Sequence, residues 1–455
     1  MAQPTPDVNQ QTGYTQELRR TLRLRDLLIY GMIFMVPIAP MAVYGYVSQQ
    51  SFGMVPLVYL VGIIAMVFTA LSYKQISARF PIAGSVYSYV QRGLNPHIGF
   101  IAGWMILADY LLVPALLYAF SATWLQSLIP GVPKFVWLIA FVVFNTIVNS
   151  LGIALQARTN FILLGIELLA LLIFLVFAIK FVFIDGHGAG GLSLRPIFQA
   201  NHISLGFIAN ATSIAVLSFL GFDAISTLAE EVDRPSRTVG TATVLALIIL
   251  GVIFMLQTYM AALVHPNYQN LDPNMGFFDI AKQAGGTFLY DLLIIINIIA
   301  AGIANALVGQ SAISRILYSM GRDKILPFSG FLSKIHPRFQ TPLNATMLVA
   351  VISILVALFV PQEKIVTLVN FGALSAFILL NFTVFVYFYI KQRKRTQVFK
   401  YLLFPLLGVL IVGYVWFGFD RVTFIFGISW LVLGIIIGAI KSKGYREVPP
   451  VLQDM

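Results

Sequence analysis

The sequence contains no cysteine and few charged residues. Without cysteine the chain can form no disulfide, no thiolate nucleophile and no cysteine-bound metal site. Charged residues make up only 10% of the 455 residues, whereas soluble domains average about 25%. Polar side chains are therefore too scarce to cover a water-facing surface, and 59% of the residues are hydrophobic. The composition excludes an ordinary soluble protein and indicates a polytopic membrane protein.

Several other kinds of site are also excluded. The five histidines, at span ends and in loops, are too scattered for a metal site: His97, His187, His202, His265 and His336. The chain has no Walker phosphate loop, no Gly-Tyr-Gly channel filter and no His-Glu-x-x-His stretch. We expect no catalytic residue, no cofactor and no enzyme activity. The net charge of +11 is explained by cytoplasmic Lys and Arg set during membrane insertion, so we expect no nucleic-acid partner.

Long apolar runs mark the membrane crossings. A helix that crosses a bilayer needs about 20 mostly apolar residues. The runs also lack the alternating pattern of membrane barrels. The predicted fold class is therefore all-α, a polytopic membrane protein with twelve transmembrane helices. The predicted spans are 27–49, 54–79, 97–125, 134–153, 158–183, 205–229, 240–264, 287–318, 342–360, 364–390, 400–418 and 422–440.

The basic residues predict the orientation of these spans. Twelve spans place the two tails, 1–26 and 441–455, on one side of the membrane. Of the 29 Lys and Arg residues, 23 lie on that side and 6 on the other. Because cytoplasmic loops carry the excess of Lys and Arg, both termini are predicted to be cytoplasmic.

Two predicted spans contain sequences that break a helix. Span 1 holds Val36-Pro37-Ile38-Ala39-Pro40, in which two prolines remove N–H donors in mid-membrane. Span 6 holds Gly221 two residues before Asp223. These spans correspond if 27–183 and 205–390 are two repeats, and an odd number of spans inverts the second repeat. Paired broken helices in inverted repeats mark transporter binding sites, whereas the alternative is a kink without function.

Three of the eighteen acidic residues lie well inside spans: Asp109, Glu167 and Asp223. An acid at the centre of a span costs about 2.5–3.5 kcal/mol on the insertion scale, so it faces a bundle interior or a water-filled cavity. We favour a cavity for Asp223; the alternative is an acid that reaches cytoplasmic water beside Glu230 and Glu231. For Asp109 and Glu167 the alternative is a structural hydrogen bond to a neighbouring helix.

Motifs spread along the chain identify a family. They are Pro81-Ile82-Ala83-Gly84-Ser85-Val86-Tyr87-Ser88-Tyr89, Gly103-Trp104, Asp109-Tyr110, Ser218-Phe219-Leu220-Gly221-Phe222-Asp223, Met320-Gly321-Arg322-Asp323 and Asn370-Phe371-Gly372-Ala373-Leu374. Together they resemble the amino acid/polyamine/organocation (APC) transporter superfamily, and within it the bacterial putrescine importers. The resemblance implies a LeuT-type five-plus-five inverted repeat with broken helices 1 and 6. The region 400–440 then adds spans 11 and 12.

The resemblance also implies that the two breaks bind the substrate. The putrescine importers carry an Asp where this chain has Ala42, so a diamine loses one counter-charge. Many amino-acid relatives have glycines where this chain has Pro37 and Ala39, and Pro40 offers no N–H to a substrate carboxylate. The candidate substrate-binding residues are Pro37, Ile38, Ala39, Met41, Ala42, Ser218, Phe219, Gly221 and Asp223.

Gate and coupling residues follow from the same resemblance. Leu217 stands where many relatives have an aromatic gate, so we expect Tyr44 or Phe219 to close the site. In several proton-coupled relatives a lysine follows the span-5 arginine by nine residues, and counting from Arg158 gives Glu167. We expect Glu167, with Asp109 as a second candidate, to carry a coupling proton; sodium is the alternative.

These observations predict a secondary active transporter, a permease that imports an amino acid or small amine across the bacterial inner membrane. Its expected partners are that solute, a proton and membrane lipid, whereas its oligomeric state stays open. With Ala42 uncharged, we expect an amino acid or monoamine rather than a diamine. The alternatives are a putrescine or polyamine importer or exchanger and a transport-inactive nutrient sensor. A sensor usually carries a large soluble tail, whereas this chain ends about 15 residues after span 12.

Overall fold

The structure is a computed structural model that describes residues 22–81, 85–151, 157–232, 235–322, 326 and 328–446. The two predicted tails, 1–26 and 441–455, lie largely outside these residues. The described part of the chain is built from helices, with one isolated backbone bridge between Leu22 and Val232. The all-α prediction is confirmed.

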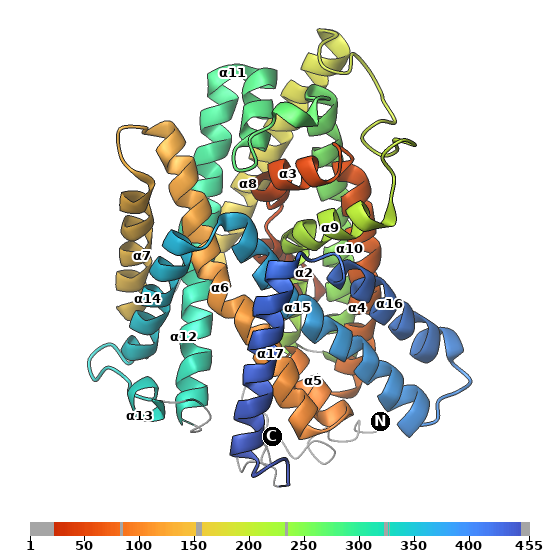
Figure 1. The fold of residues 1–455 in the computed structure, drawn as a ribbon, viewed down its shortest axis with the longest axis vertical. Coiled ribbons are helices and arrows are strands. Elements are labelled where there is room, and N and C mark those ends of the chain that lie inside the picture. Colours follow the sequence, from red (N-terminus) through yellow and green to blue (C-terminus); the bar gives the residue numbers. More distant parts are fainter. Residues whose placement is uncertain are drawn as a thin grey trace, which may run out of the picture.

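The helices form one bundle (Figure 1). Exposed faces of α8, α14 and α17 carry mostly large apolar side chains, as helices facing lipid do. The helices are α2 (Leu24–Met35), α3 (Pro40–Gln50), α4 (Val55–Arg79), α5 (Ser85–Gly93), α6 (Pro96–Leu128), α7 (Lys134–Ser150), α8 (Ala157–Ile179), η1 (Lys180–Ile184), α9 (Leu205–Ala215), η2 (Val216–Phe219), η3 (Phe222–Glu231), α10 (Pro235–Val264), η4 (Tyr268–Asn270), α11 (Gly276–Asn297), η5 (Ile298–Asn305), α12 (Ala306–Arg322), α13 (Ser329–Leu332), α14 (Leu343–Phe359), α15 (Gln362–Val384), η6 (Phe385–Lys391), η7 (Phe399–Leu403), α16 (Phe404–Trp416) and α17 (Arg421–Lys441).

The helix lengths support a multi-pass membrane protein. Among the described residues, eight helical runs are long and apolar enough to cross a membrane, and two bent pairs raise the number to ten. Two shorter apolar helices, α7 and α14, lie where the sequence predicts spans 4 and 9. The count of twelve spans is reached when both shorter helices are included. The division into the repeats 27–183 and 205–390 stays a prediction.

The first span is broken between α2 and α3. The two helices are bent by 56° at a gap between Met35 and Pro40. Val36 has a positive φ of 55°, and Pro37 has no N–H to donate, so the helical hydrogen-bond ladder stops there. The predicted break in span 1 is confirmed.

The sixth span is broken at Gly221. α9 continues into the 3-10 segment η2, and the bend to the 3-10 segment η3 is 41°. Gly221, between η2 and η3, has a φ of 104°, a conformation that glycine adopts without a Cβ penalty. The predicted break in span 6 is also confirmed.

The backbone of the eighth span changes its helical conformation along its length. Gly286 in α11, with a φ of 69°, separates the first turns of the helix from the membrane-crossing part. Below it, η5 is a π-helix that continues into α12. π-helical segments in α-helices frequently occur at functional sites. This span therefore has irregular backbone at the level of the bundle centre.

The broken helices pack against each other, and the longest helix, α6, packs against the neighbouring spans. α2 contacts η3 and α10, while α3 contacts α9. α6 contacts α12, η5 and α15. In Figure 1 α11 reaches the upper end of the molecule and α3 lies below it in the upper half, whereas α5 and α13 lie toward the lower end. Both breaks thus lie between the two ends, within reach of α6, η5 and α12.

Candidate functional site

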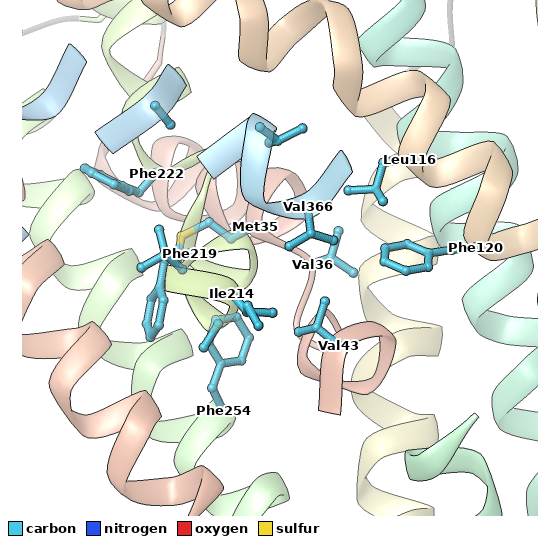
Figure 2. Close-up of a cluster of buried hydrophobic side chains, with 14 of the residues drawn as sticks. Met35, Val36, Val43, Leu116, Phe120, Ile214, Phe219, Phe222, Phe254 and Val366 are labelled. Atoms are coloured by element: carbon cyan, nitrogen blue, oxygen red, sulfur yellow. The ribbon is translucent and has the colours of Figure 1, made fainter. Parts of the chain in front are cut away.

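A cavity of about 160 Å³ lies where the two broken helices meet α6 and span 8. Val36, Ala39 and Ala42 line it from the first break, and Leu217, Leu220, Gly221 and Asp223 line it from the sixth span. Figure 2 shows Val36 near Leu116 and Phe120 of α6, which line the same cavity. Sites for drug-sized ligands occupy about 300–1,000 Å³, so this cavity suits a smaller solute.

The cavity is elongated, because two helices line it along several turns. On α6 the lining residues follow one face in steps of three or four: Asp109, Val113, Leu116, Phe120 and Trp124. Trp124 lies fifteen residues after Asp109, which corresponds to about 22 Å along the helix axis. Along span 8 the matching stripe runs from Asn297 at the end of α11 through Ala301 and Asn305 of η5 to Ala312 of α12. Most of the wall between the two ends is aliphatic.

Two carboxylates from different helices line this cavity. Asp109 of α6 is 9% exposed, and Asp223 of η3 is 5% exposed. Among the described residues that line the cavity, none is Lys, Arg or His. A carboxylate at the wall of a buried cavity attracts a cation or takes up a proton, so the cavity suits a cationic ligand or a protonated acid.

The first break offers few donors to an anion. Pro37 and Pro40 have no N–H, and the N–H groups of Ala39, Met41 and Ala42 donate to backbone carbonyls in the same turns. In this stretch at most the N–H of Ile38 remains for a substrate carboxylate. The Pro37 carbonyl accepts a hydrogen bond of 2.9 Å from the Gln257 side chain. The break is therefore satisfied by protein groups and is poor in anion-binding donors.

The structure brings only part of the predicted set into the cavity. Ala39, Ala42, Gly221 and Asp223 line it, and so does Asp109, which was predicted for coupling. Five other predicted residues lie at the breaks outside the cavity wall: Pro37, Ile38, Met41, Ser218 and Phe219.

The residues outside the wall have structural partners. Ser218 exchanges a hydrogen bond of 2.8 Å with the Tyr59 hydroxyl. The Phe219 ring packs 5.8 Å from Tyr59 and 5.3 Å from Phe254, on the α4 and α10 side (Figure 2). The Met41 sulfur accepts a hydrogen bond from the Asn297 amide. Their proposed contact with substrate stays a prediction.

Aromatic contacts close the upper side of the cavity. Tyr44 packs edge-on against Phe277 at the start of α11, with 5.5 Å between ring centroids. Next to it, Phe278 packs 5.4 Å from Trp124, which lines the cavity. Tyr44 therefore lies in the seal between cavity and upper end, whereas Phe219 lies to one side. The gating roles of both residues stay predictions.

Glu167 lies apart from the cavity. It belongs to the buried stripe of α8, with Leu164, Ala170 and Phe174, whereas the opposite face of α8 is exposed. Its Oε2 atom is buried and has no hydrogen-bond partner among the described residues. α8 contacts both α2 and η5, which adjoin the cavity. The coupling role of Glu167 is untested by this placement.

Two larger chambers flank the cavity. The lower chamber, of about 360 Å³, shares Phe34, Val308 and Ala312 with the cavity wall. Phe34 packs 5.2 Å from Tyr30, which also lines that chamber. The upper chamber, of about 940 Å³, includes Tyr44 in its wall and shares no lining residue with the cavity. The cavity therefore adjoins the lower chamber and shares no wall residue with the upper one.

Sequence reasoning missed several lining residues. The polar ones are Tyr110, Trp124, Asn297 and Asn305, and an aromatic one is Phe34. Asn297 and Asn305 carried a usable signal, because polar residues inside an apolar span face a bundle interior. No comparable signal marked Phe34 or Trp124, since aromatic residues are also common in lipid-facing and core positions.

Comparison with known proteins gives a consistent result. The sequence profile described as amino acid permease matches residues 27–448. The low-affinity putrescine importer PlaP of Escherichia coli K12 is 33% identical over 447 residues, covering 96% of this chain and 97% of that protein. The branched-chain amino acid permease BcaP of Bacillus subtilis is 25% identical, covering 96% of each chain. A methylthioribose transporter of Bacillus subtilis is 24% identical over 94% of this chain and 95% of that protein.

Proposed function

We propose that the central cavity of this chain, which belongs to the amino acid permease family, selects a small cationic amine. The supporting observation is the pair of buried carboxylates, Asp109 and Asp223, in a cavity wall without a basic residue among the described residues. An ammonium group within about 4–6 Å of such a carboxylate stabilises its ionised form.

Three classes of solute are candidates for the cavity, and its lining residues suit them to different degrees. An amino acid also needs donors for its carboxylate, and the proline-rich break supplies few of them. Ala42 led us to expect a single ammonium group, but Asp109 supplies a second carboxylate to the same cavity. A diamine is therefore the second candidate, and the name of PlaP agrees with it. A neutral amino acid is third, in line with the name of BcaP.

The transport direction and coupling follow as part of the proposal. We place the chain in a bacterial inner membrane with both termini cytoplasmic, so that the lower chamber opens to the cytoplasm and the upper chamber to the outside. Import is secondary active, with a proton as the coupling ion carried at Asp109 or Glu167. Sodium dependence of uptake would count against this coupling, and solute binding without accumulation would favour the sensor alternative.

Asp223→Asn tests the proposed amine contact. Affinity for the amine is expected to fall about tenfold or more, because a hydrogen bond to a charged group contributes about 1.5–3 kcal/mol. The measurement is a thermal-shift titration of purified protein with amino acids, monoamines and diamines, since ligands stabilise the state that binds them.

The matched control is Asp185→Asn, which removes an exposed carboxylate paired with Lys180 at 2.7 Å. This variant should keep the affinity of the parent. If Asp223→Asn binds amines normally and only turnover falls, Asp223 acts in gating and the proposed contact is wrong.

A further inference from the structure

We propose that Gln257 of α10 is a positioning residue for the solute site, because its side-chain amide supplies the hydrogen-bond donor that Pro40 cannot offer to the first break. This inference rests on the proposed function and adds a residue that lies outside the cavity wall. Gln257 acts through the backbone of the break, which in turn places residues of the wall. It therefore influences the affinity for the solute without contacting it.

The backbone hydrogen bonds of the first break follow one pattern with a single gap. Three carbonyls accept from the N–H three residues further on, at 2.9, 3.0 and 3.2 Å: Val36 from Ala39, Ile38 from Met41 and Ala39 from Ala42. The carbonyl of Pro37 belongs to the same series, but the residue three positions further on is Pro40, which has no N–H. The series therefore lacks the donor for the Pro37 carbonyl.

Gln257 fills this gap from a neighbouring helix. Its Nε2 atom donates to the Pro37 carbonyl at 2.9 Å, and the side chain is 0% exposed. The second nearby acceptor, the carbonyl of Ile253, lies 3.5 Å from the same Nε2 atom, so both neighbours require the nitrogen on this side. α10 also contacts α2 and η3. The hydrogen bond therefore ties the first break to a helix that packs against both broken spans.

The other half of the Gln257 amide indicates that the donor is what matters at this position. Its Oε1 atom is buried and has no hydrogen-bond partner among the described residues. Burying an unpaired polar atom is unfavourable, so an apolar side chain of similar length would suit the packing better. The amide therefore contributes through its hydrogen bond to the break and not through its fit in the core.

Two more buried amides treat irregular backbone in the same way. Asn370 of α15 donates to the carbonyls of Ser213 and Ile214 at 2.7 and 3.2 Å, where α9 changes into the 3-10 segment η2. Asn145 of α7 donates to the carbonyl of Gly302 in the π-helix η5 at 2.8 Å. Both are 0% exposed, and their Oδ1 atoms have no partner in the described part of the chain. The arrangement at the first break is therefore repeated at the other irregular segments beside the cavity.

The first break also places part of the cavity wall. Val36, Ala39 and Ala42 line the cavity on both sides of the Pro37 carbonyl in sequence, whereas Gln257 does not line it. A buried carbonyl without a donor is costly, so a Pro37 carbonyl released from Gln257 would turn towards another donor. The turn that carries Val36 and Ala39 would then lose its fixed position. Affinity for the solute should fall although no contact with the solute is removed.

Gln257→Met tests this role on the full-length protein, because Met has a similar length and no donor. The probes are n-butylamine and 1,4-diaminobutane, and isothermal titration calorimetry measures their dissociation constants. Affinity should fall about three- to tenfold, the range for the loss of one hydrogen bond. The melting temperature without ligand should change little, because the unpaired Oε1 atom is exchanged for an unpaired Pro37 carbonyl. Unchanged affinity, or a loss of affinity seen only with a large fall in melting temperature, overturns the inference.

Pro40→Ala provides a rescue, since it restores an N–H three residues after Pro37. In this background the added Gln257→Met should change affinity by about twofold or less, so the two substitutions are non-additive. An equal loss in both backgrounds overturns the inference. If Gln257→Met alone does not fold, the double variant should fold and bind, and a double variant that also fails overturns the inference.

The matched control is Thr258→Val, at the next residue of α10. Thr258 is also 0% exposed, but its hydroxyl donates to carbonyls of its own helix, to Phe254 at 2.7 Å and to Met255 at 3.1 Å. This variant should keep the affinity of the parent. A loss equal to that of Gln257→Met would mean that any buried polar change in α10 weakens binding, which overturns the inference.

The outcomes distinguish this inference from the proposed function. If the wild-type protein binds amines and Gln257→Met binds them equally well, the proposed function stands and only the role of Gln257 fails. If the wild-type protein binds neither probe nor any other amine, the proposed function fails and the inference fails with it.

Discussion

At the scale of single residues, the two breaks depend on unusual backbone conformations that face each other. Val36 has a φ of 55° in the first break, and Gly221 has a φ of 104° in the second. A Cβ placed on Gly221 would lie 3.1 Å from the carbonyl oxygen of Phe34, the residue that separates cavity and lower chamber. Gly221 therefore sets both the local conformation and the close approach of the two broken helices.

Gly221→Ala should lower the stability of the protein and impair transport. A left-handed conformation costs an L-residue about 1–2 kcal/mol, and the added Cβ also presses on the Phe34 carbonyl. The control is Gly186→Ala, since Gly186 also has a positive φ of 69° but a methyl group added there would meet no described atom within 4 Å. Thermal melting and uptake should show a larger loss for Gly221→Ala; equal losses would mean that the contact with Phe34 contributes nothing.

At the scale of elements, the sequence located the breaks but not the direction of the side chains around them. Pro37 lacks an N–H donor and Gly221 weakens a helix, so both interruptions could be predicted from the sequence. The segments beside Gly221 are 3-10 helices, which turn every three residues and rotate side chains away from α-helical positions. Leu217 and Leu220 therefore face the cavity, whereas Ser218 and Phe219 pack on α4 and α10.

The N-terminus of α17 is stabilised by a single acidic residue. Asp420 caps α17 by accepting from the N–H groups of Val422 and Thr423 at 2.9 and 3.2 Å. It also pairs with Lys364 of α15 at 3.1 Å. Burial raises the pKa of Asp420, but the hydrogen bonds from Thr423 and Lys364 outweigh it and the net pKa is lowered. The folded state therefore prefers the ionised carboxylate.

Two substitutions of Asp420 separate these contributions. Asp420→Ala removes cap and ion pair and should cost about 1 kcal/mol. Asp420→Asn keeps a capping side chain and should cost less at neutral pH, because a partly exposed ion pair contributes about 0–1 kcal/mol. Since the folded-state pKa is depressed, the advantage of wild type over Asn is full above the unfolded value of about 3.9 and is lost as the pH falls through the folded value. Melting curves of both variants against pH check this; an advantage that grows on acidification would contradict it.

At the scale of the whole molecule, three spaces lie in series from one end of the bundle to the other. The central cavity shares Phe34 with the lower chamber, whereas Tyr44, which packs on Phe277, lines the upper chamber and not the cavity. Under the proposed function, this arrangement is one state of a carrier that exposes its site to one side at a time. An opposite state requires the seal between α3 and the start of α11 to open and the lower side to close.

The site as a whole was only partly predictable from the sequence, because tertiary folding assembles it. Asp109 and Asp223 were found from sequence, because an acid inside a span is costly and so conspicuous. That they share one cavity is a result of the tertiary fold, which brings residues of α6 and η3 to the same cavity wall and which no local pattern encodes. For the same reason Glu167, an equally conspicuous acid, lies on α8 outside the cavity wall.

The orientation of the molecule in the membrane decides which chamber faces the cytoplasm. The motivation is the distribution of Lys and Arg, 23 on one side and 6 on the other in the predicted topology. Lys443 follows α17 near the lower end, and Gln269 lines the upper chamber; both are exposed. Since the chain has no cysteine, Lys443→Cys and Gln269→Cys each create a single reactive thiol without further changes.

A membrane-impermeant maleimide added to intact cells should label Gln269→Cys but not Lys443→Cys, and permeabilised cells should label both. The cysteine-free parent gives the background of the assay. Labelling of both variants in intact cells would contradict an odd number of membrane crossings between the two positions. Labelling of Lys443→Cys alone would mean that the orientation is opposite to the predicted one. The lower chamber would then face the outside, and the adjoining cavity would be positioned to load solute rather than to release it.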